Sequence, residues 1–304
     1  MDILKTNALS KTYRKTKALD GINITIHQGD IYGFIGKNGA GKTTLIRVIA
    51  GIAEPTSGSF SLFGESKPSG IIKARRRMAA VVESPALHLN LSAYDNLKLQ
   101  CILLGIQENH DGVIRDVLKQ VDLEKLLIER KKKSKNFSLG MRQRLGIAMA
   151  LISKPQFLIL DEPNNGLDPE GIRDLRQLLL KLNQEQGLTM LISSHMLTEL
   201  SKLATRYGFI DRGKLLREIN VEELKKESRQ ATILQLSSSK LKIDELNAAG
   251  LKDFELIGSN LRIYGQQSLQ PYLNELLKQH IELVNMQKES DDLEAFFMNM
   301  IGGK

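Results

Sequence analysis

Short apolar runs alternate with longer stretches of helical periodicity from residue 1 to about residue 218. The clearest unit begins with the apolar run Ile31–Ile35, which is typical of a buried strand. A glycine-rich segment, residues 36–41, follows it, and Lys42–Ala50 then has the pattern of a helix that Gly51 ends. Strands and helices alternating in this way predict an α/β fold with a mostly parallel sheet.

Helical patterns dominate between residues 92 and 153, where three of them occur with few strand signals. The strand Met78–Val82 precedes this stretch, and the apolar strand Phe157–Leu160 follows it. We therefore expect a helical subdomain, about residues 84–153, inserted into the α/β core.

The pattern changes after about Asn220 to strand, helix, strand, strand, helix and strand. The strands are expected at 231–236, 253–257, 261–264 and 281–286, and the helices at 241–249 and 269–279. This order is that of a small ferredoxin-like α+β unit. A last helix is expected at about residues 293–300, and the charged stretch 221–230 has the composition of a linker. The sequence thus predicts two domains, 1–219 and 220–304.

The composition is that of a globular protein, with 41% hydrophobic and 26% charged residues. The single cysteine, Cys101, excludes an internal disulfide, and the first residues lack the layout of a signal peptide. No apolar run approaches the roughly 18 to 20 residues that cross a bilayer, so a membrane role would require a partner. These features predict a cytoplasmic location.

The net charge of +8 and the pI near 9.4 raise the question of a polyanionic partner. The densest cluster consists of Lys131, Lys132, Lys133 and Lys135, with no interleaved aromatic side chain for base stacking. We therefore expect no nucleic-acid partner. A solvated surface is the ordinary explanation of such a run, and proximity to anionic lipid headgroups is the alternative.

Residues 36–43, Gly-Lys-Asn-Gly-Ala-Gly-Lys-Thr, match the phosphate-binding pattern G-x-x-x-x-G-K-[ST], or Walker A, at every fixed position. Glycines let backbone N–H groups surround phosphate oxygens, Lys42 adds a cation, and the Thr43 hydroxyl is a ligand for Mg²⁺. The alternative, a purely structural glycine-rich turn, fits the strand-then-helix context poorly. The residues expected to bind ATP here are Gly36, Asn38, Gly39, Ala40, Gly41, Lys42, Thr43 and Thr44.

Asp161 and Glu162 follow the apolar strand Phe157–Leu160, which matches the Walker B pattern. A buried parallel strand places such a pair at the carboxyl edge of the sheet, where ligands of open α/β sheets bind. Asp161 would hold Mg²⁺, and Glu162 would orient or deprotonate the attacking water. Taken alone, an acidic helix N-terminus explains the pair equally well. The phosphate-binding loop favours the catalytic interpretation.

Residues 137–144, Phe-Ser-Leu-Gly-Met-Arg-Gln-Arg, resemble the signature LSGGQxQR of the ABC ATPases. Ser138 is also a sensible helix N-cap, so its hydroxyl and the free N–H groups there form a second anion site. The resemblance implies that Ser138, Gly140 and Met141 face an ATP held by the opposite subunit of a homodimer. Leu139 and Met141 differ from the Gly and Gln that are commonest at these positions.

Three more positions resemble this family, in the family's order. Tyr13 stands where an aromatic residue stacks on adenine, and Asp168 ends a segment, residues 165–168, that resembles the dimer-contacting D-loop. His195 stands at the place of the switch histidine that senses the γ-phosphate, so the resemblance implies a catalytic role beside Glu162 and Lys42. Each position alone has an ordinary explanation, such as a surface Tyr, a polar turn or a half-exposed His.

Glu83 occupies the Q-loop position, where most relatives carry Gln. The resemblance places it beside Mg²⁺ with Thr43 and Asp161, where a carboxylate adds a negative charge. Glu83, residues 85–97 and the signature together resemble the bacterial subgroup that exports bacitracin or confers lantibiotic self-protection.

The resemblance spans residues 1 to about 218 and implies a P-loop NTPase fold that binds ATP and Mg²⁺. It further implies an ATP-hydrolysing subunit that dimerises on ATP and drives a separate integral-membrane permease, exporting an antimicrobial peptide or drug. A soluble ABC-type ATPase with a regulatory role outside transport is the alternative. A GTPase would need a guanine-reading N-K-x-D, and a DNA-repair relative a long heptad run; the sequence has neither.

Overall fold

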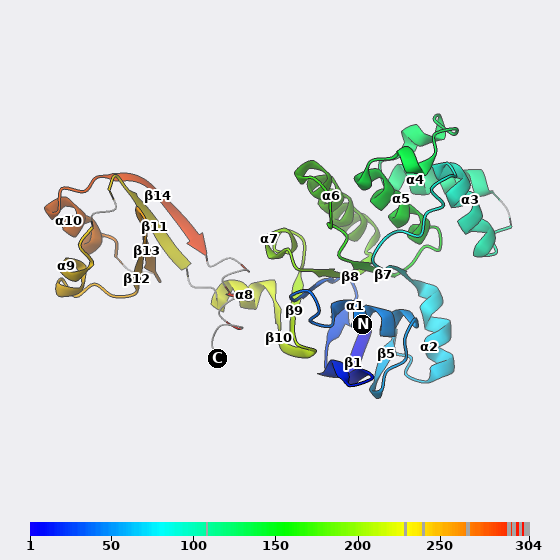
Figure 1. Cartoon of the computed structure of the whole chain (residues 1–304), viewed down its shortest axis with the longest axis horizontal. Coiled ribbons are helices and arrows are strands. Elements are labelled where there is room, and N and C mark those ends of the chain that lie inside the picture. Colours follow the sequence, from blue (N-terminus) through cyan, green and yellow to red (C-terminus); the bar gives the residue numbers. More distant parts are fainter. Residues whose placement is uncertain are drawn as a thin grey trace. The chain divides into compact units, whose positions relative to one another are not determined.

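The computed structural model describes residues 1–107, 109–227, 230–238, 241–265 and 268–290, and residues 293, 296, 297 and 300. The chain divides into two compact units, Met1–Asn220 and Val221–Lys304 (Figure 1). Within the described residues, no helix is both long and apolar enough to span a bilayer.

The first unit is built on a six-stranded sheet in the order β10-β9-β4-β8-β7-β6. All neighbours are parallel except β9 and β10, which confirms the expected mostly parallel sheet. The strands are β4 (Ile31–Ile35), β6 (Met78–Val81), β7 (Phe157–Asp161), β8 (Thr189–Ser194), β9 (Arg206–Asp211) and β10 (Lys214–Asn220). Every residue of β4, β7 and β8 is buried, as expected for parallel strands covered on both faces.

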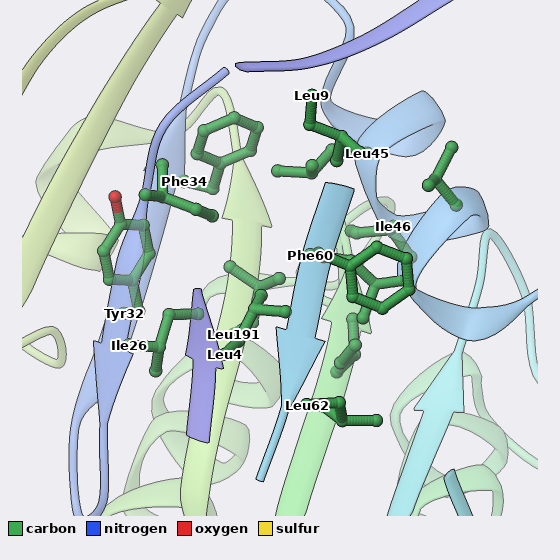
Figure 2. Packing of buried hydrophobic residues seen from close by; sticks show 14 of the residues in the cluster. Leu4, Leu9, Ile26, Tyr32, Phe34, Leu45, Ile46, Phe60, Leu62 and Leu191 are labelled. Carbon is green, nitrogen blue, oxygen red and sulfur yellow. The ribbon is translucent and has the colours of Figure 1, made fainter. Parts of the chain in front are cut away.

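A second, antiparallel sheet is formed by β1 (Asp2–Tyr13), β2 (Thr16–Ile22), β3 (Thr25–His27) and β5 (Ser57–Leu62), with β1 pairing all three others. The sequence pattern did not predict this sheet. Its residues Leu4 and Leu62 share one core with Leu45 and Ile46 of helix α1 (Lys42–Ala50) and with Leu191 of β8 (Figure 2). The helix that follows the glycine loop is thereby fixed by both sheets.

The inserted subdomain contains α3 (Ala93–Leu103), α4 (His110–Gln120) and α5 (Leu139–Leu151), which agree with the three predicted helices. Ser92 and Asn109 cap α3 and α4 with their side chains. The remaining helices of this unit are α2 (Pro68–Ala74), α6 (Pro169–Gln186) and α7 (Leu197–Leu200), with short 3-10 turns at Arg75–Arg77, Glu124–Leu127 and Ser134–Asn136.

The second unit begins with α8 (Val221–Glu227) and has the element order that the sequence predicts. It consists of β11 (Gln230–Leu236), α9 (Ile243–Ala248), β12 (Phe254–Ile257), β13 (Asn260–Tyr264), α10 (Gln270–Lys278) and β14 (Leu283–Ser290). The sheet is antiparallel in the order β12-β13-β11-β14 and carries its own core, including Leu234, Leu261 and Tyr272.

Two expectations for this unit are not met or cannot be compared with the structure. The last strand starts at Leu283 instead of Ile281, because the Ile281 N–H is bonded to the Leu276 carbonyl and its side chain is buried in the core. The helix expected at 293–300 lies mostly outside the described residues.

Candidate functional site

The glycine loop connects β4 to α1 and passes tightly against neighbouring backbone. A Cβ atom on Gly36 would lie 2.5 Å from the Ile210 carbonyl oxygen. Gly41 has φ of 115° and a Cβ there would lie 2.5 Å from the Ala18 oxygen, so neither position accepts a side chain. Gly41 is the N-cap of α1 and provides no side-chain hydrogen bond. Within the described chain, the first N–H groups of α1 therefore lack a side-chain cap and can receive an anion.

The other residues of the loop and of the first turn of α1 differ in their exposure to solvent. Asn38 and Gly39 are exposed, and Ala40 is buried with its N–H bonded to the Lys37 carbonyl at 3.1 Å. Thr43 and Thr44 are half-buried in the first turn of α1.

Lys42 folds its side chain back into the loop. It is 5% exposed, and its Nζ donates to the Gly36 carbonyl at 2.6 Å and to the Lys37 carbonyl at 3.3 Å. The same ammonium lies 3.0 Å from Glu162 Oε1. From this position the Lys42 ammonium can exchange these partners for an anionic ligand with only a small movement.

The end of β7 provides the two carboxylates. Asp161 is 3% exposed, and its Oδ1 accepts a hydrogen bond from Ser193 Oγ at 2.5 Å. Ser193 Oγ in turn accepts from the Glu162 N–H at 2.9 Å. Ser193 stands directly opposite Asp161 in the parallel register of β7 and β8. Sequence reasoning missed Ser193, although two serines at the end of an apolar strand, directly before His195, are a usable signal.

Glu162 lies between two cationic or potentially cationic side chains. Its Oε2 is 2.8 Å from His195 Nδ1 and accepts from the His195 N–H at 3.4 Å. Its Oε1 is buried and has no hydrogen-bond geometry to any described group, even to the Lys42 ammonium beside it. The Lys42 ammonium is thus its ionic neighbour, and the oxygen could accept a hydrogen bond from another donor once that ammonium moves away.

Glu83 does not join this group in the structure. It follows β6 with φ of 64°, its side chain is 61% exposed, and its carboxylate forms an ion pair with Arg47 of α1. Among the described residues, no three acidic, His or Cys side chains converge as a metal site. The Arg47 pairing was not foreseen, because α1 and the end of β6 become neighbours only in the folded chain.

The predicted signature segment forms the start of α5. Ser138 is the N-cap and its Oγ accepts from the Met141 N–H at 3.2 Å. Leu139 is 40% exposed and contacts the turn at Gly166, where an added Cβ would lie 3.0 Å from Leu139 Cδ2. Gly140 lies beside the same turn, since a Cβ added to it would lie 3.9 Å from Leu167 Cδ2. The two segments therefore form one surface within the chain.

Two other predicted residues have plain local roles. Asp168 caps α6 by accepting from the Gly171 N–H at 3.0 Å. Tyr13 ends β1, is 42% exposed, and has the Lys11 ammonium 4.9 Å from its ring centroid. It pairs with Thr16 at the start of β2, the strand whose Ala18 carbonyl packs on Gly41.

Comparison with known proteins identifies relatives of this chain. The family model described as ABC transporter matches residues 19–165. The bacitracin transport ATP-binding protein BcrA of Bacillus licheniformis is 41% identical over 304 residues, which cover 99% of this chain and 98% of that protein. The lantibiotic transport ATP-binding protein SrtF of Streptococcus pyogenes is 42% identical over 73% of this chain and 95% of its own. The solved ATP-binding cassette MJ0796, a dimer bound to ADP and Pi, has a TM-score of 0.64 and 26% identity over 72% of this chain and 98% of its own.

Proposed function

The chain belongs to the ABC transporter family of ATP-binding proteins, and on that basis we propose that it hydrolyses ATP to drive export through a separate permease. The observation that carries the proposal is the convergence of Lys42 and His195 on the two oxygens of Glu162, at 3.0 Å and 2.8 Å. The relatives named for bacitracin and lantibiotic transport favour a peptide antibiotic as the cargo.

ATP would bind by exchanging the partners of Lys42. In the structure, the ammonium donates hydrogen bonds to two loop carbonyls and forms an ion pair with Glu162. Phosphate oxygens carry more charge and would accept from it and from the uncapped N–H groups of α1. The exchange also releases Glu162 for another role. Tyr13, exposed at the end of β1, would stack on adenine.

The residues present fit a magnesium ion. Thr43 offers a hydroxyl, and Asp161 offers a buried carboxylate that Ser193 orients. When bound with ATP, Mg²⁺ would neutralise charge on the β- and γ-phosphates. Glu83 would reach this site only after leaving Arg47.

Hydrolysis would begin at Glu162. Its carboxylate would accept a proton from water, or orient that water, as it attacks the γ-phosphorus atom. The bond from the γ-phosphorus to the bridging oxygen then breaks, and ADP leaves with the electron pair. His195 holds Glu162 Oε2 through Nδ1 and would thereby fix the carboxylate and sense the phosphate.

The sites would be shared between two copies. The chain has one Walker A loop and one signature segment, and MJ0796 is a dimer. The N-terminus of α5, with Ser138, Gly140 and Met141, would cap the γ-phosphate held by the loop of the other copy. The turn at Gly166 lies against Leu139, and Asp168 directly after this turn would lie at the same joint.

The permease would dock in a groove between the core and the helical subdomain. This groove, of about 1130 Å³, is lined by β6, the loop after it, the end of α3, and α5. Leu103 and Leu104 on its rim are 72% and 44% exposed. Pro85, two residues beyond Glu83, also lines the groove, so an occupant would touch the loop that carries Glu83. Docking would hold the chain on the inner face of the membrane.

Co-purification from detergent-solubilised membranes tests the proposal. We expect the tagged chain to bring down a protein with about six apolar spans and to show ATPase activity, and Leu103→Asp to lose that protein while keeping ATP binding. Recovery of an active ATPase without a membrane protein would favour a role outside transport.

A further inference from the structure

A basic loop, residues 128–135, projects from the helical subdomain between the turn Glu124–Leu127 and α5. Ile128 at its start is 88% exposed, the highest value among the exposed large apolar side chains described. Five cations follow against one carboxylate, Glu129, which pairs with Lys132 at 3.0 Å. Lys131, Lys133 and Lys135 are exposed, and no acidic partner occurs for them in the described chain.

The backbone of the basic loop is firmly held although its side chains are exposed. Ser134 is fully buried, its N–H donates to the Leu91 carbonyl at 2.8 Å, and its Oγ accepts from Asn96 at 3.2 Å. The Lys135 N–H donates to the Leu89 carbonyl at 2.9 Å, and Arg142 donates to the Phe137 carbonyl at 3.0 Å. Lys135, and Lys133 through its bridge with Ser92, therefore project from an anchored backbone, which lowers the entropy lost when a partner binds.

The aromatic residues next to the loop are already occupied. The Arg130 guanidinium lies 4.3 Å from the Tyr94 ring centroid, and the Tyr94 hydroxyl donates to Asp111. Phe137 is 4% exposed and has Lys132 beside its ring. Base stacking, which single-stranded nucleic acids require, has no open ring here among the described residues.

An exposed isoleucine beside unpaired lysines suits a surface that is anionic outside and apolar beneath. We propose that the basic loop binds the anionic headgroups of a membrane directly, with Ile128 inserted below them. This contact is additional to attachment through a permease and does not depend on ATP. It gives the subunit its own affinity for an anionic membrane.

Vesicle co-sedimentation with the purified full chain tests this contact. The vesicles are phosphatidylcholine alone, or phosphatidylcholine with about one third phosphatidylglycerol. We expect binding to the anionic vesicles only, weakening as salt rises. Each lysine at an anionic surface contributes about a fivefold change in affinity, so changing Lys131, Lys133 and Lys135 together to Gln should lower it by about a hundredfold. Ile128→Ser should lower it by about tenfold.

The matched control changes three exposed lysines elsewhere in the same unit, Lys67, Lys73 and Lys119, to Gln. It makes the same change in net charge and should keep the affinity within about threefold of the unchanged chain. Unchanged ATP binding and thermal midpoint establish that each variant is folded. Equal loss in both triple variants, no binding of the unchanged chain to anionic vesicles, or tighter binding to duplex DNA than to vesicles would overturn the proposal.

Discussion

Lys42 Nζ lies 3.0 Å from Glu162 Oε1, so the loop lysine and the glutamate after β7 neutralise each other across the site. Both side chains are mostly buried, with 5% and 16% exposure. A buried charge that loses its partner is destabilising, which means that each of the two needs a replacement when the pair separates. When ATP binds, a phosphate oxygen would become the new partner of Lys42. Water would become the new partner of Glu162, which would keep its contact with His195.

Lys42→Ala should lower ATP affinity by about 10- to 100-fold, because a charge-assisted bond to the phosphates is lost. Hydrolysis should fall to background. Titration with a fluorescent ATP analogue measures the first effect and phosphate release the second. Lys73→Ala, an exposed lysine on α2, serves as the control and should change neither. Near-normal hydrolysis by Lys42→Ala would refute the phosphate-binding assignment.

Glu162→Gln should bind ATP, hydrolyse it about 100- to 10,000-fold more slowly, and accumulate as a dimer. The amide keeps the size of the carboxylate and its bond to His195 but accepts no proton. Size-exclusion chromatography with light scattering, with ATP and then with ADP, measures the assembly. We expect the dimer with ATP only. A monomer at saturating ATP, even with the permease present, would contradict the shared site.

Glu83→Gln should change the rate of ATP hydrolysis several-fold while ATP affinity stays within about twofold, if the carboxylate acts near the metal. The Arg47 pair is exposed and contributes about 0.2 to 1 kcal/mol, too little to account for a large effect through stability. Arg47→Ala provides the comparison. Identical kinetics for Arg47→Ala and Glu83→Gln would mean that Glu83 acts only as the partner of Arg47.

Gly146→Ala should destabilise the first unit by about 1 to 3 kcal/mol, because the new Cβ would lie 2.4 Å from Pro85 Cβ. Chemical denaturation measures the loss. Pro85→Gly removes that Cβ, and in the double variant it should recover part of the stability. If the two changes in the free energy of unfolding were strictly additive, Gly146 of α5 and Pro85 would not be in energetically coupled contact.

The loop and its flanking elements could be predicted closely because glycines mark their limits. The predicted helix Lys42–Ala50 has the bounds found, and Gly51 ends it with φ of 81°. The β1–β2 hairpin is local, with Tyr13 opposite Thr16, and was missed for want of a recognised turn signal. The pairing of β1 with the distant β5 escaped prediction because no local pattern encodes it. Ser193 and Arg47 escaped for the same reason, since each acquires its partner only through the sheet register or the packing of α1. The functional roles of Tyr13, Asp168 and the signature residues stay predictions.

The second unit closes a core of its own around Leu234, Leu261 and Tyr272. A segment that buries its own apolar side chains can be gained or lost by a gene without exposing the core of its neighbour. Selection can therefore act on the second unit while the fold of the first unit is kept.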